Sequence, residues 1–202
     1  DVPPVTAPGN PTMPPTLETA RLILRPFEDR DRDAFAALVA DPEVMRFFPA
    51  PLDRARSDAL IDRLEAHRAA ALAAFPALEL KATGECIGFA GLHASVMPGT
   101  DAPCVEVGWR LARPAWGQGY ATEAARADIA RGFAPRAEGG LGLTGIVAFA
   151  VAANAPSLAV MERLGMTRDP ADDFALPDFP PGHPHRAGAL YRLRACDFAP
   201  DR

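Results

Sequence analysis

Apolar and polar residues alternate in the middle of the chain and then change to helical spacing. From residue 105 to residue 111 every second side chain is apolar, which is the period of a β-strand with one buried face. After a Gly-Gln-Gly sequence at residues 117–119, apolar residues recur at four-residue intervals from Ala121 to Phe133, as on one face of a helix. The pattern predicts a strand that leads through a glycine turn into a helix.

The same periodicities predict the other elements. We expect further strands at residues 21–26, 77–81, 86–93, 143–152 and 191–194. Helices are expected to begin near Asp29 or Asp31, near residues 53–57 with an end at Phe75, and after Asn154. The stretch 143–152 is apolar almost throughout, which is typical of a strand buried on both faces. This order predicts an α/β fold, with a mixed sheet and helices on both of its faces.

Length and composition favour a single globular domain. The chain has 202 residues, of which 49% are hydrophobic, and this is enough for one well-packed core. We assign the domain to residues 16–202. Residues 1–15 are rich in proline and have neither the basic start nor the apolar centre of a signal peptide, so we expect a flexible tail there.

Charge and cysteine content exclude several classes of function. The net charge of −5 argues against a nucleic-acid surface, which needs a basic stripe. No apolar run is long enough to predict a membrane span. Cys86, Cys104 and Cys196 are too scattered for a disulfide framework and lack the spacing of metal ligands. We therefore expect a cytoplasmic protein without a bound metal.

The glycine turn has the chemistry of a phosphate site. A helix that begins there leaves backbone N–H groups unpaired, and its dipole adds positive potential at the same place. Such helix ends bind phosphate groups. Gly117 and Gly119 would let a pyrophosphate approach these amides, because neither has a side chain. A tight connection between strand and helix is the alternative explanation of the two glycines.

A second helix start follows the apolar run that ends at residue 152. Asn154 is a typical N-cap, Pro156 suits the first turn, and Gly165 suits the end of the helix. The residues that share the apolar face of this helix are Leu158, Met161 and Leu164. The chain therefore contains two successive junctions at which a strand leads into a helix.

These two junctions and the segments around them resemble the GNAT superfamily of N-acetyltransferases. The glycine turn lies in RPAWGQGYATEAA (residues 113–125), and the second junction lies in NAPSLAVMERLGM (residues 154–166). Segments similar to the family's first strand and helix, the following loop, the central hairpin and the last strand are ETARLILRPFEDRD, DPEVMRFF, TGECIGFAGLH and ALYRLRACDF. The resemblance covers residues 16–198. Trp116 and Ser157 are similar to the RimJ/RimL-like branch, which contains acetylases of ribosomal-protein amino termini.

The resemblance implies a mixed, mostly antiparallel central sheet of roughly six to seven strands, flanked by about four helices. It also implies acetyl-CoA as co-substrate, in a cleft where the strands that end at Leu111 and Ala152 separate. The backbone of Trp109 and Leu111 would pair with the pantetheine arm, and Asn154 would bind the same arm. The Trp109 N–H would polarise the thioester carbonyl. The remaining implied cofactor residues are Trp116, Gly117, Gln118, Gly119, Tyr120, Ala121 and Thr122.

Two residues are assigned to proton transfer. By resemblance, Ser157 would protonate the departing thiolate, because the tyrosine that many family members use is replaced by Met161. Glu106 lies on the polar face of its strand and is a candidate general base, since the attacking amine must be uncharged. The alternatives are a carboxylate at the rim of the site for Glu106, and purely structural roles in the helix for Asn154 and Ser157.

Other titratable residues are further candidates. His93, which ends a predicted strand, is an alternative base. His183 and His185 lie in a long loop rich in proline and aspartate, where they would line the acceptor site or be solvated. Cys104 has no basic neighbour in the sequence that would make it a nucleophile.

The resemblance implies an enzyme that moves the acetyl group directly to a primary amine, without a covalent enzyme intermediate. We expect an α-amine of a peptide, a protein or a small molecule to be preferred. The alternatives are acetylation of an antibiotic or a polyamine, a non-catalytic acyl-CoA sensor, and a dinucleotide oxidoreductase, which would need a third glycine where Thr122 stands. We expect a monomer or a homodimer.

Overall fold

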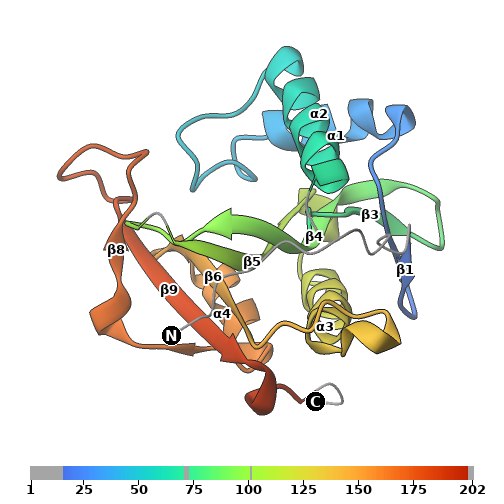
Figure 1. Cartoon of the computed structure of the whole chain (residues 1–202). Coiled ribbons are helices and arrows are strands. Elements are labelled where there is room, and N and C mark those ends of the chain that lie inside the picture. The colour runs from blue at the N-terminus through green and yellow to red at the C-terminus, as the bar shows by residue number, and fades with distance from the viewer. Residues whose placement is uncertain (1–15, 71–72, 101, 200–202) are drawn as a thin grey trace.

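The computed structural model describes residues 16–70, 73–100 and 102–199, which form a nine-stranded sheet with helices on both faces (Figure 1). The strands lie in the order β1-β2-β3-β4-β5-β6-β9-β7, and β8 also pairs with β9. Every pair is antiparallel except β5 with β6, which is parallel. The expected tail at residues 1–15 lies outside the described residues.

The elements agree with the predicted order. The strands are β1 (Leu17–Glu18), β2 (Leu22–Arg25), β3 (Ala77–Leu80), β4 (Cys86–Val96), β5 (Pro103–Leu111), β6 (Gly145–Val151), β7 (Thr167–Arg168), β8 (Phe174–Ala175) and β9 (Ala187–Arg194). The α-helices are α1 (Arg32–Ala40), α2 (Arg54–Ala70), α3 (Tyr120–Phe133) and α4 (Ala155–Arg163). The strands beyond the expected number are two-residue pairings at the margins of the sheet. The mixed, mostly antiparallel α/β fold is thus confirmed.

Two boundaries differ from the sequence prediction. Helix α2 ends at Ala70 rather than at Phe75. Pro76 disfavours the helical conformation of Phe75, and the carbonyl of Ala73 accepts a hydrogen bond from the N–H of Ala94 in β4 at 2.9 Å. Strand β9 begins at Ala187 rather than at residue 191, because it pairs with β6 along the whole of that strand.

The helices divide the core into two layers. α1 and α2 pack against one face of the sheet, where Phe35, Ile61 and Phe89 belong to one apolar cluster. α3 and α4 pack against the other face, where Val107 and Ile129 belong to another (Figure 1). Alternate residues of β5 therefore face different layers: Val105 and Val107 face α3 and α4, whereas Glu106 and Arg110 face α1 and α2.

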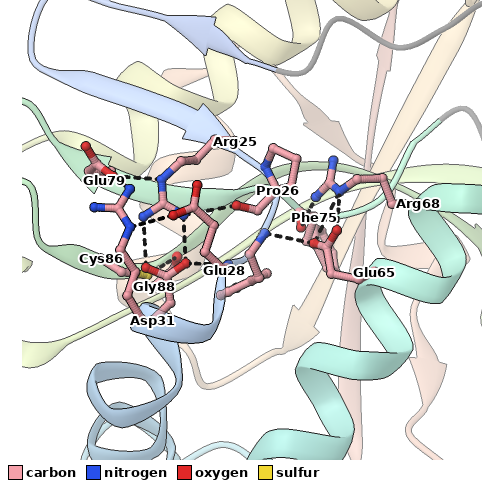
Figure 2. Close-up of polar contacts among 12 residues, drawn as sticks. Arg25, Pro26, Glu28, Asp31, Glu65, Arg68, Phe75, Glu79, Cys86 and Gly88 are labelled. Carbon is pink, nitrogen blue, oxygen red and sulfur yellow. Dashed lines mark hydrogen bonds and ion pairs between the residues drawn. The ribbon is translucent and has the colours of Figure 1, made fainter.

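A buried ion-pair network ties β2 to β3 and to the start of α1 (Figure 2). The Arg25 guanidinium donates to both carboxylate oxygens of Asp31, at 2.7 and 2.8 Å, and to Glu79 at 2.7 Å. Burial alone would raise the pKa of Asp31, but hydrogen bonds from Arg25 and from the Glu28 N–H outweigh it and hold that pKa below its usual value. The network fixes the chain entering α1 against the sheet.

Candidate active site

The parallel strands β5 and β6 are joined at one point. Glu106 and Val147 are their only register pair among the described residues, although β5 continues to Leu111 and β6 to Val151. Beyond Glu106, β5 pairs with β4 alone. The two strands therefore separate toward their carboxyl ends, where the chain enters α3 and α4. We call this divergent pair of strands the β5–β6 seam.

The backbone of β5 offers free polar groups to the seam. The N–H of Ala112 donates to the carbonyl of Ile87 at 2.9 Å, so it points toward β4. In an antiparallel ladder the direction of these groups alternates, so the N–H groups of Trp109 and Leu111 point the other way, toward β6. The Trp116 indole N–H donates a hydrogen bond to the Leu111 carbonyl at 2.8 Å. The predicted cofactor site requires the Trp109 N–H to point between β5 and β6, and the backbone of β5 has this direction.

The glycine turn leaves the start of α3 open. Gly117 and Gly119 have φ angles of +71° and +79°, which only glycine adopts readily. Gly119 is the N-cap and provides no side chain to cap the helix. The backbone N–H groups of residues 117–122 have no hydrogen-bond acceptor among the described residues. This part of the chain thus presents a run of free amide donors at the positive end of a helix dipole.

The start of α4 is closed by its own N-cap. The Asn154 side-chain oxygen accepts the Ser157 N–H at 3.3 Å, and the Asn154 carbonyl accepts the Leu158 N–H at 3.1 Å. The capping role of Asn154 is therefore confirmed, while its side-chain amide keeps its own donors for another partner. Ser157 is partly buried in the first turn, and its neighbour Met161 is buried in the core, as the apolar spacing predicts.

Glu106 and His93 lie side by side on the α1/α2 face. His93 Nδ1 is 3.2 Å from Glu106 Oε1, although the ring N–H is not aligned for a good hydrogen bond. The other ring nitrogen, Nε2, lies 3.0 Å from Nδ1 of His67 in α2. Burial and the neighbouring His93 both lower the pKa of His67, which favours the neutral ring. Glu106, His93 and His67 thus lie in one line, with a close contact at each nitrogen of the His93 ring.

The Phe75 ring fixes this line against the sheet. It stacks on His93, with ring centroids 4.6 Å apart, and on Phe89 at 4.7 Å. It also covers Gly108, where an added Cβ would lie 3.0 Å from the ring. Arg68 of α2 donates to the Phe75 carbonyl at 3.0 Å (Figure 2). Phe75, which the sequence places at the end of a helix, therefore positions a candidate base from outside α2.

The two loop histidines belong to an aromatic cluster. His183 stacks on Phe179, with centroids 4.8 Å apart, and His185 lies 5.3 Å from Phe47. Phe47 comes from the segment between α1 and α2, so the long C-terminal loop touches that segment. Neither histidine contacts Glu106 or His93 in this arrangement. We find the pair at the meeting point of two loops rather than beside the candidate base.

Cys104 does not have the properties of a nucleophile. Its side chain is 2% exposed and packs with Val147 and Leu190. Burial, together with the nearby Glu106 carboxylate, raises the pKa of its thiol to about 11. The thiol is therefore protonated at neutral pH, a state in which it is a poor nucleophile.

Comparison with known proteins identifies the family. Residues 21–167 match the acetyltransferase (GNAT) domain. The chain is 32% identical to the uncharacterized protein YkkB of Bacillus subtilis, over 74% of this chain and 84% of that protein. It is 31% identical to an FsC-acetyl coenzyme A-N(2)-transacetylase of Aspergillus fumigatus, over 76% of this chain and 65% of that protein.

Solved structures agree with this result. An acetyltransferase from Agrobacterium tumefaciens is 29% identical, with a TM-score of 0.70 over 94% of this chain and 99% of that one. RimL, a ribosomal L7/L12 α-N-protein acetyltransferase, shares the fold at 16% identity, with a TM-score of 0.67 over 90% of this chain and 93% of that one. The chain belongs to the GNAT acetyltransferase family. It is an acetyl-CoA-dependent N-acetyltransferase, as the two junctions predict.

Within residues 16–70, 73–100 and 102–199, no helix combines the length and apolar character needed to cross a bilayer. The same residues contain no group of three or more histidine, cysteine, aspartate or glutamate side chains placed to hold a metal ion.

Proposed function

We propose that the chain transfers the acetyl group of acetyl-CoA to an α-amine, with the thioester held in the β5–β6 seam. One observation carries this proposal. The unpaired backbone N–H groups of β5 at the seam lie next to the free N–H groups at the start of α3. A pyrophosphate would lie on the amides of residues 117–122, beside Trp116. The pantetheine arm would run along Trp109 and Leu111 toward Asn154. Peptide-like amides in that arm suit an unpaired strand edge.

The proposed reaction has a balanced set of proton transfers. The amine nitrogen attacks the thioester carbonyl carbon, and the Trp109 N–H stabilises the oxyanion that forms. The carbon–sulfur bond then breaks and releases coenzyme A. Glu106 takes the proton lost by the amine, and Ser157 gives its hydroxyl proton to the leaving thiolate before regaining one from water. His93 and His67 connect Glu106 to the surface of α2.

The preference for an α-amine rests on the cost of deprotonation. At pH 7 an α-amine with a pKa of about 7.8 is about 14% uncharged, whereas a lysine side chain with a pKa of about 10.4 is about 0.04% uncharged. The difference corresponds to roughly 3.5 kcal/mol that the enzyme need not supply. A single partly buried carboxylate next to two histidines suits the easier acceptor. The fold shared with RimL and the relative named for N(2) transacetylation support transfer to nitrogen.

Peptide acceptors provide the test. Two peptides of one sequence would be compared at pH 7, one with a blocked amino terminus and a free lysine, the other with the reverse, and thiol release from acetyl-CoA would be measured. We expect faster release with the free amino terminus, and a large loss of rate in Glu106→Gln that recovers as pH rises through the pKa of the amine. Faster acetylation of lysine would reject the α-amine preference. Absence of thiol release with every amine would reject the assigned activity.

A further inference from the structure

Arg110 has a positive charge that no described residue neutralises. It follows Glu106 and Gly108 along the α1/α2 face of β5 and is only partly exposed. Its Nε is buried and has no hydrogen-bond partner. In the part of the chain that the structure describes, its guanidinium forms no ion pair and no hydrogen bond. A buried charge without a partner is costly, so its presence requires an explanation.

In the described part of the chain, the other buried or partly buried arginines all have hydrogen-bond partners, unlike Arg110. Arg25 binds Asp31 and Glu79, Arg131 binds Asp128 at 2.7 Å, and Arg68 binds Glu65 at 3.1 Å. The remaining arginines that are not fully exposed also donate to carboxylates or backbone carbonyls: Arg32, Arg126, Arg186 and Arg192. Arg110 differs from all of them because its guanidinium donates to no carboxylate or carbonyl of the described residues.

Aromatic rings hold the Arg110 guanidinium in place. It lies 3.9 Å from the centroid of Phe48, in the segment between α1 and α2, and 5.5 Å from that of Phe89. Such contacts orient a guanidinium without consuming its hydrogen-bond donors. Burial and the nearby Arg63 lower the pKa of Arg110 to about 10, so it is still charged at neutral pH.

We infer that Arg110 binds the carboxylate of the acceptor, so that the substrate is an amine that also bears a carboxylate. This inference rests on the proposed function, because it places the acceptor on the same face of β5 as Glu106. The Cα atoms of residues 106 and 110 lie about 13 Å apart on an extended strand, and their side chains approach one acceptor from two ends. Gly108 and the Phe75 ring lie between them. A planar guanidinium with free donors matches a carboxylate in two hydrogen bonds.

The test compares acceptors with and without the negative charge. Alanine and alaninamide would be assayed by thiol release, together with the dipeptides Ala-Asp and Ala-Asn as C-terminal amides. We expect the intact enzyme to favour at least one carboxylate member of these pairs, and Arg110→Gln to reduce its kcat/KM about 10- to 100-fold. The KM for acetyl-CoA should not change, which separates the acceptor from the phosphates of the cofactor. Arg56→Gln, an exposed change of equal charge, is the matched control.

Binding and stability give readouts that do not depend on turnover. In the presence of coenzyme A, calorimetry should show that N-acetylalanine binds the intact protein more tightly than its amide, and that Arg110→Gln removes the difference. Arg110→Met should unfold at the same or a higher urea concentration, because it removes an unpaired charge. Equal binding of acid and amide, or a clear loss of stability in Arg110→Met, would overturn the inference. The assigned activity would then stand if acetyl transfer to amines persists.

Discussion

The glycine turn permits a matched test of the cofactor site. Gly119 has φ +79°, and an added Cβ would meet only Arg21 Nη2, at 3.5 Å. Gly139, in the turn after α3, has φ +83° and nothing within 4 Å of an added Cβ. Alanine in this left-handed conformation costs about 1–2 kcal/mol at either position. Gly119→Ala and Gly139→Ala should therefore lose similar amounts of stability.

The two variants should differ in binding. A methyl group on Gly119 projects from the free amides of residues 117–122 and keeps a phosphate from its best approach. A hydrogen bond to a charged group contributes about 1.5–3 kcal/mol, so losing one weakens acetyl-CoA binding roughly 10- to 100-fold. Gly139→Ala should bind as tightly as the unchanged protein.

Calorimetric titration of each variant with acetyl-CoA would measure the affinity, and urea unfolding would measure the stability. Equal affinity of Gly119→Ala and Gly139→Ala, with both variants folded, would refute the assignment of the pyrophosphate to this turn. A weaker affinity in both would show that backbone strain, and not the contact with the cofactor, is responsible.

Two further predictions concern the proton-transfer groups. Ser157→Ala should lower kcat about 10- to 100-fold with little effect on acetyl-CoA affinity, and an unchanged kcat measured by thiol release would give the proton transfer to water. The pKa of His67 is lowered in the folded state, so below about pH 6.5 the unfolded chain binds a proton that the folded chain does not, and stability rises with pH across the window just below that value. His67→Gln should flatten this rise in urea unfolding measured from pH 5 to pH 7.5, whereas an unchanged slope would assign it to other groups.

The sequence predicts the elements and the glycine turn because both depend on short stretches of chain. The alternation in β5, the two turn glycines and the Asn154 cap are local signals, and each appears in the structure at the expected residues. The end of α2 is harder to predict. Its alanine-rich continuation has a helical composition, but Ala73 bonds to β4 and Pro76 follows, so tertiary contacts override local propensity.

The residues that we propose for the acceptor side of the site are brought together by contacts between distant segments. His67 and His93 are separated by 26 residues and come together only when α2 packs on β4. The sequence shows that Arg110 belongs to the polar face of its strand, because it alternates with apolar residues. It does not show that, among the described residues, the folded protein has no carboxylate beside Arg110. The role of Phe75 cannot be predicted from the sequence either, since it depends on the ring lying over Gly108.

The seam places an edge strand inside a sheet. Exposed strand edges recruit other chains and promote aggregation, so proteins protect them with charges, bulges or covering loops. The free edge of β5 is protected in another way. Strand β6 lies next to it, helices cover both faces of the sheet, and the Trp116 indole N–H donates a hydrogen bond to the Leu111 carbonyl. The unpaired backbone groups are thus shielded from a neighbouring polypeptide, whereas the proposed site would open them to a small peptide-like ligand.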